Sequence, residues 1–102
     1  MDMRQMMRQA QKMQKELAKA QEEIATMTFE GTAGGGMVKA IAKGDNTIAS
    51  LSINPDAVDP EDVEILQDMV VAAVNEALRG VSELSSQRMN AATGGMNIPG
   101  LM

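Results

Sequence analysis

Five basic side chains recur along the first nineteen residues at intervals of three or four positions, the spacing of one face of an α-helix. They are Arg4, Arg8, Lys12, Lys15 and Lys19. On a helix of 3.6 residues per turn they fall within an arc of roughly 80°. A row of ammonium and guanidinium groups can bind phosphates or another polyanion. An ordinary solvated helix face is the alternative, and the spacing alone leaves both interpretations open.

The excess of basic over acidic residues in this stretch favours a bound polyanion. Residues 1–19 hold five of the nine basic residues and two of the fourteen acids, Asp2 and Glu16. Like charges four positions apart repel by roughly a few tenths of a kcal/mol, and cations near a helix start oppose the helix dipole. An anionic partner would offset both costs. The net charge of −5 argues the other way, so the distribution of charge carries the prediction.

Other kinds of site find little support in the residue types. The chain has no His and no Cys, which removes the commonest general base, the commonest metal ligand and thiolate chemistry. The run Gly34-Gly35-Gly36 leads into a strand pattern, which favours a hairpin turn over a phosphate loop. The acids around Asp59 lack calcium-loop spacing, and the serines lack a nucleophile-elbow pattern. We expect no enzymatic activity, no cofactor and no metal.

Length and hydropathy bound the class of protein. The 102 residues fit one domain, which we expect over residues 1–92, with 93–102 as a loose, flexible tail. No run is long and apolar enough to predict a membrane span. Arg4 and Arg8 interrupt any signal-peptide core. We therefore expect a cytoplasmic protein.

Residues 2–25 are predicted to form the helix that presents the basic face, because they contain no Gly or Pro. A heptad seam runs on the opposite side, at Met3, Met6, Ala10, Met13, Leu17, Ala20, Ile24 and Met27. The seam packs either on the chain's own sheet and second helix or on the same helix of a second subunit. Its principal contact residues in either case are Met6, Met13, Leu17 and Ile24.

Three short strands are predicted in the middle of the chain, over residues 26–32, 37–43 and 47–53. Glycine-containing turns separate them, so they should form an antiparallel meander. Alternation predicts which side chains share the inner face: Val38, Ala40 and Ala42 in the second strand, with Lys39 and Lys43 outward, and Ala49, Leu51 and Ile53 in the third.

A second long helix is predicted to begin at Asp59-Pro60, with Asp59 as the cap and Pro60 in the first turn. Its apolar face would comprise Val63, Leu66, Val70, Ala73, Ala77, Val81 and Leu84. Gly80 interrupts the pattern, and we expect the helix to bend or break there. The predicted fold class is therefore α+β, with a long N-terminal helix, a three-stranded antiparallel meander and a long C-terminal helix. A thin core and open sheet edges favour a homodimer.

Several segments, taken together, carry a family resemblance. They are the N-terminal Met/Gln/Lys helix, Gly34-x-Gly36-x-Val38, Ile53-Asn54-Pro55, the stretch from Asp62 to Ala77, and Gly94-Gly95-Met96-Asn97-Ile98-Pro99-Gly100. These segments resemble the YbaB/EbfC family of bacterial nucleoid-associated proteins. The resemblance implies a tweezer-like homodimer whose protruding helices bind DNA, located in the cytoplasm and nucleoid. Asn54 stands where Asp is more usual, which should affect only the turn.

The resemblance implies DNA-binding residues on both long helices. On this chain these are Arg4, Arg8, Lys12, Lys15, Lys19, Arg79 and Arg88. The predicted function is binding of duplex DNA through its phosphates with little sequence specificity. Phe29 is the only aromatic residue, which disfavours single-strand binding by base stacking.

Two other functions are compatible with the same residues. One is a coiled-coil interaction module that grips partner helices through the Met-rich seam. The other is an amphipathic helix on an anionic membrane, which ranks lower because Met and Ala make a less bulky apolar face. We expect no membrane partner and no small-molecule substrate.

Overall fold

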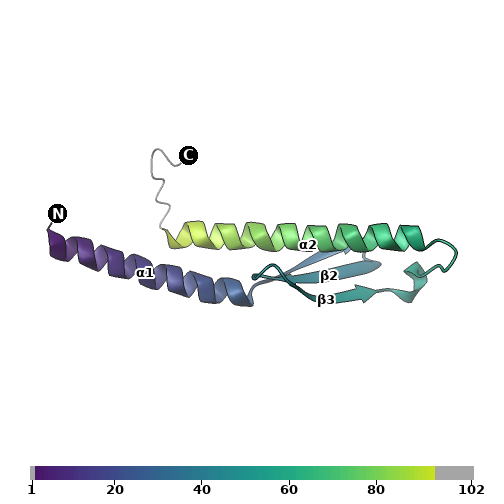
Figure 1. Cartoon of the computed structure of the whole chain (residues 1–102), viewed down its shortest axis with the longest axis horizontal. Helices are drawn as coiled ribbons and strands as arrows, with labels where there is room; N and C mark the ends of the chain where they lie inside the picture. Colours follow the sequence, from purple (N-terminus) through teal and green to yellow (C-terminus); the bar gives the residue numbers. More distant parts are fainter. Residues whose placement is uncertain (1, 94–102) are drawn as a thin grey trace, which may run out of the picture.

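The computed structural model describes residues 2–93, which form two long helices and one sheet. The elements are α1 (Met3–Thr26), β1 (Thr28–Ala33), β2 (Val38–Lys43), β3 (Ile48–Ile53), the 3-10 turn η1 (Pro55–Ala57) and α2 (Val63–Ala92). The molecule is elongated, 71 × 26 × 16 Å, with α1 and the sheet following one another alongside α2 (Figure 1). The predicted α+β class is confirmed. Of the tail predicted over residues 93–102, all but Thr93 lies outside the described residues.

Helix α1 matches the range predicted from its composition. Asp2 caps it, because the Asp2 Oδ1 atom accepts a hydrogen bond from the Gln5 backbone N–H at 2.8 Å. At 1.5 Å per residue, its 24 residues reach about 36 Å. None of the helices in residues 2–93 is long and apolar enough to cross a membrane.

The sheet is the predicted antiparallel meander, with strand order β1-β2-β3. The turn between β1 and β2 requires glycine, since Gly34, Gly35 and Gly36 all have positive φ angles. Val38 lies opposite Ile53 and Ala40 opposite Leu51, as alternation predicts. A register shift after Ile41 then places Ile48 opposite Ala42. The prediction that Ala49 continues this face is therefore wrong, because the extra residue in β3 reverses the alternation.

The core lies between α2 and the first two strands. Its fully buried side chains are all small: Val38, Ala40, Ala42, Ala73, Ala77 and Val81. Gly31 of β1 lies directly against the backbone of Ala73 and Ala77, leaving no space for a side chain. The helix can approach the sheet closely because glycine and alanine line the contact. The predicted inward orientation of the three β2 residues is confirmed.

Helix α2 begins later than predicted. The Asp59 Oδ1 atom accepts a hydrogen bond from the Glu61 N–H at 2.9 Å and so closes a turn instead of capping a helix. The helix starts at Val63, after Asp62, and Val63 is 47% exposed rather than in the core. The turn before it follows expectation, since the Asn54 side-chain oxygen accepts from the Asp56 N–H as an aspartate would.

The predicted bend or break at Gly80 is wrong, because α2 is continuous from Val63 to Ala92. Gly80 is buried, and the ring of Phe29 occupies the space that a side chain at this position would need. The glycine therefore serves packing between α2 and β1, at the cost in helix propensity that a mid-helix glycine brings.

Candidate nucleic-acid interface

Within residues 2–93, only the C-terminal half of α1 packs against the other elements. Ala20 is fully buried, and Leu17 and Ile24 are half-buried where α1 runs antiparallel to α2. The Arg88 Nε group donates a hydrogen bond to the Glu23 carboxylate, which fixes the level of the two helices. Four residues beyond Arg88, α2 ends at Ala92, at about the level of residue 19 of α1. The preceding part of α1 projects beyond α2 (Figure 1).

This arrangement divides the predicted heptad seam. Its C-terminal half packs within the chain, and Met13 is half-buried near the end of α2. Its N-terminal half is uncovered, with Met3 77% and Met6 56% exposed. The sequence left open whether the seam packs within or between subunits; in this chain the part from Met13 to Ile24 packs within it.

The five cations of the basic face, Arg4, Arg8, Lys12, Lys15 and Lys19, are all exposed. Among residues 2–93 the only ion pair joins Glu23 and Arg88, so none of the five cations forms one there. Glu16 and Glu23 neighbour Lys12 and Lys19 on the helix surface, at the C-terminal part of the row. No acid occurs between Met3 and Lys15. Acids return only where α1 meets α2, at Glu16, Glu22 and Glu23. The positive potential is therefore concentrated on the projecting part of α1.

Arg88 differs from these five cations because it is engaged within the chain. Its side chain is 21% exposed and pairs with Glu23. The hydrogen bond from Arg88 holds the pKa of the Glu23 carboxyl below its ordinary value, and the same bond raises the pKa of Arg88. The structure thus gives Arg88 a role in clamping α1 to α2. No local pattern could reveal this pair, since 65 residues separate its members.

Arg79 is exposed on the outer side of α2, away from the basic face. Glu76 precedes it by three positions and Glu83 follows by four, so both acids neighbour it on the helix surface. It lies about 20 Å along α2 from Ala92, where the basic face of α1 begins. The structure does not bring Arg79 together with the cations of α1.

A further pair of cations, Lys39 and Lys43, is exposed on the sheet face opposite α2. Glu30 lies on the neighbouring strand opposite Ile41, between the two lysines, and is exposed as well. This sheet face therefore mixes charges of both signs. It provides a comparison surface for the basic face of α1, with the same residue type but weaker potential.

The fold and the basic face define a class: a small α+β protein that presents cations on a projecting helix. A sequence model of the YbaB/EbfC DNA-binding family matches residues 1–96. The chain belongs to this family. The resemblance inferred from the motifs is thereby confirmed.

Similar proteins span nearly the whole chain. A nucleoid-associated protein of Pelotomaculum thermopropionicum is 54% identical over 100 residues, covering 98% of this chain and 95% of that protein. One of Thermoanaerobacter pseudethanolicus is 56% identical over 96 residues, covering 94% and 86%. A solved structure, an uncharacterized protein of Helicobacter pylori, is 27% identical, with a TM-score of 0.68 over 93% of this chain and 97% of that one.

Proposed function

We propose that this protein is a nucleoid-associated homodimer that binds duplex DNA through the basic face of α1, without catalysis. Membership of a DNA-binding family supports DNA as the partner. The observation that carries the proposal is the row of five exposed cations on a projecting helix, none of which forms an ion pair within residues 2–93. Binding DNA would place the protein in the nucleoid, within the bacterial cytoplasm.

The geometry of the basic face suits phosphates. From Arg4 to Lys19 it extends about 22 Å along α1, and duplex DNA carries one charge per roughly 1.7 Å of axis. Each released counterion adds to the salt dependence, so five contacts per subunit predict a slope of log K against log salt of about −4.5 per subunit. Long Lys and Arg side chains on phosphates carry no sequence information, which supports binding with little sequence specificity.

An exposed apolar surface beside β3, formed by Ile48, Leu51 and Val71, supports the homodimer. Helix α2 covers β1 and β2, whereas nearly all of β3 is exposed. On the face shared with Val38 and Ala40, Ile48 is 37% and Leu51 43% exposed. Val71 of α2 is 58% exposed. An apolar surface of this kind, beside an edge strand, is usually covered by a partner.

The exposed apolar residues of α2 and β3 also lie on the same side of the molecule, so they can form one surface. Gly80 of α2 lies against Phe29 of β1, and Met69 lies against Gly34 in the turn that follows β1. Val74 and Leu78 lie on the opposite flank of the helix, by about 120° or more. Because the strand order is β1-β2-β3, that flank is turned toward β3. A second copy that covers β3 and this flank would double the number of basic helices.

A salt titration tests the DNA-binding proposal. Labelled duplex DNA is titrated at several salt concentrations with the wild type, Lys12→Glu/Lys15→Glu and Lys39→Glu/Lys43→Glu. The last variant changes the charge equally but on the sheet face. We expect a steep salt slope for the wild type and the sheet variant, and loss of affinity with a flatter slope for the α1 variant.

Two outcomes would contradict the proposal. Equal weakening by both variants would show that net charge rather than the basic face of α1 controls binding. No binding by the wild type would favour the protein-interaction module that the Met-rich seam also permits. Circular dichroism of each variant checks that both helices are retained.

A further inference from the structure

The uncovered part of the seam forms an apolar groove on the projecting half of α1. Met3, Met6, Met7 and Ala10 line this groove, which has a volume of about 280 Å³. Their side chains are exposed, with Met3 at 77%, Met6 at 56% and Met7 at 59%. Three neighbouring exposed methionines make a contiguous apolar surface, which a soluble protein usually covers.

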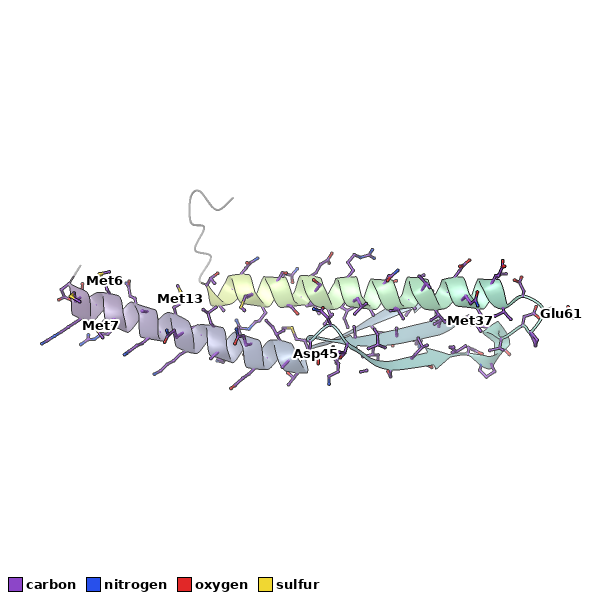
Figure 2. The ribbon with its side chains drawn as sticks, viewed as in Figure 1. Met6, Met7, Met13, Met37, Asp45 and Glu61 are labelled. Atoms are coloured by element: carbon purple, nitrogen blue, oxygen red, sulfur yellow. The ribbon has the colours of Figure 1, made fainter. Side chains whose placement is uncertain are left out.

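This groove continues the surface on which α2 packs. From Leu17 to Ile24 that side of α1 lies against α2, Met13 is half-buried, and from Ala10 to Met3 the same side is exposed. Met6 and Met13 lie on the side of α1 that is turned toward α2 (Figure 2). Helix α2 ends at Ala92, about 14 Å along the axis from Ala10, where the uncovered part begins. The chain after Thr93 therefore starts from the end of α2 that lies toward the groove.

The nine residues that follow have a suitable composition. Residues 94–102 read Gly-Gly-Met-Asn-Ile-Pro-Gly-Leu-Met and contain no charged side chain. Met96, Ile98, Leu101 and Met102 are apolar. Pro99 and the glycines disfavour a continuous helix over this segment. A segment with four apolar side chains and no charge can cover an apolar groove of this kind.

The segment is also long enough. Ala92 lies at about the level of residue 19 of α1, so Met3 is roughly 24 Å further along the axis. Nine extended residues reach about 30 Å. The segment can therefore follow the groove to its end without any change in the helices.

We propose that residues 94–102 dock in the apolar groove formed by Met3, Met6, Met7 and Ala10 of the same chain, and so extend the packing of α2 along α1. Docking would cover the apolar side of the projecting helix and leave its basic face, on the opposite side, free. The proposal concerns packing within one chain and does not rest on DNA binding.

A spin label tests the docking. The chain has no Cys, so Asn97→Cys in the full chain gives one nitroxide site. Methyl spectra of ¹³C-labelled methionine then report its proximity. We expect the label to more than halve the intensity of the Met3, Met6 and Met7 methyl signals and to leave Met37, in the turn beyond the sheet, unchanged.

Matched variants separate docking from mere tethering. Ile98→Asp/Leu101→Asp, added to the labelled chain, removes two apolar contacts and should restore the methyl intensities. Gly95→Asp/Gly100→Asp adds the same charge without removing an apolar side chain, and should leave the broadening in place. Equal broadening in both variants, or none in the parent, would overturn the proposal.

A mixing experiment identifies the chain that supplies the segment. Spin-labelled chains without ¹³C are mixed with ¹³C-methionine chains without a label, after unfolding and refolding together. Docking within one chain predicts no broadening in the mixed sample beyond that of dilute free nitroxide. Strong broadening in the mixture, or methyl shifts that depend on concentration, would assign the groove to a second copy and contradict the proposal.

Discussion

Arg88 of α2 and Glu23 of α1 form the ion pair that joins the two long helices. Met27 follows α1 directly, and the Gly44 N–H donates a hydrogen bond to its carbonyl oxygen at 3.0 Å. The helix that carries the cations is thus held at its C-terminal end by side-chain pairing with α2 and by a backbone contact with the sheet.

Removing either member of the pair should loosen α1. Arg88→Gln and Glu23→Gln are each expected to lower the melting temperature and to speed amide hydrogen exchange in α1 more than in β2. The double variant should be little worse than either single one, because both remove the same interaction. Full additivity of the two effects would show that the pair is not coupled.

Acid should weaken the same contact. Because Arg88 holds the pKa of Glu23 below its ordinary value of 4.5, the ionised carboxylate stabilises the folded state above that pH. The contribution is lost as the pH falls through the lowered folded pKa. Melting curves from pH 7 to pH 3 should therefore show the wild type losing its advantage over Glu23→Gln below about pH 4.5. A constant difference across this range would contradict the assignment.

Glycines at the helix–sheet contact should resist substitution. Gly31→Ala places a Cβ against the backbone of Ala73 and Ala77, which cannot move aside, and should cost about 3 kcal/mol or more. Gly80→Ala meets only the Phe29 ring and gains about 1 kcal/mol in helix propensity, so its cost should be smaller. Urea unfolding measures both, with exposed Ser86→Ala as the control. Similar costs at both glycines would contradict the close backbone contact.

The cations should contribute unequally to DNA binding. Replacing Lys12 by Gln should reduce the magnitude of the salt slope by about 0.9 and weaken binding alike on different DNA sequences. Arg79→Gln should leave the slope unchanged, because Glu76 and Glu83 flank this residue. Fluorescence anisotropy at four salt concentrations gives both slopes. A larger effect of Arg79 would place the contact on α2 instead.

A charge on the uncovered face of β3 should separate the proposed dimer. Leu51→Asp introduces a carboxylate into the apolar surface beside β3, whereas Ser50→Asp places the carboxylate on the opposite face of the same strand. We expect Leu51→Asp to sediment as a monomer and Ser50→Asp to match the wild type in analytical ultracentrifugation. Dimers of unchanged affinity in Leu51→Asp would locate the interface elsewhere.

Local patterns predict much of this fold. The helix over residues 2–25, the three strands and their order follow from periodicity and turn residues, which are local properties. The basic face follows from the spacing of Arg4 to Lys19. The close alternation of Val38, Ala40 and Ala42 likewise identifies the inner face of β2 before any contact is known.

The remaining features depend on contacts between distant residues. The side chain of Asp59 could cap a helix or close a turn. It accepts a hydrogen bond from the Glu61 N–H and closes a turn, so α2 starts later, at Val63. Gly80 resembles a helix breaker until the position of Phe29 is known. The heptad seam has one apolar pattern throughout, yet its residues before Met13 are exposed because they lie beyond the end of α2. A periodic pattern shows which face is apolar and not how far its partner extends.

The close approach of α2 to the sheet also has a mechanical consequence. Glycine and alanine at the contact make the sheet end of the molecule a compact base, while α1 leaves this base as a rod held near Glu23. A rod held at one end acts as a lever, so a rotation of a few degrees at the base displaces Met3 far more than Ala20. Paired levers of this kind would adjust their span to differently shaped duplexes without repacking the core.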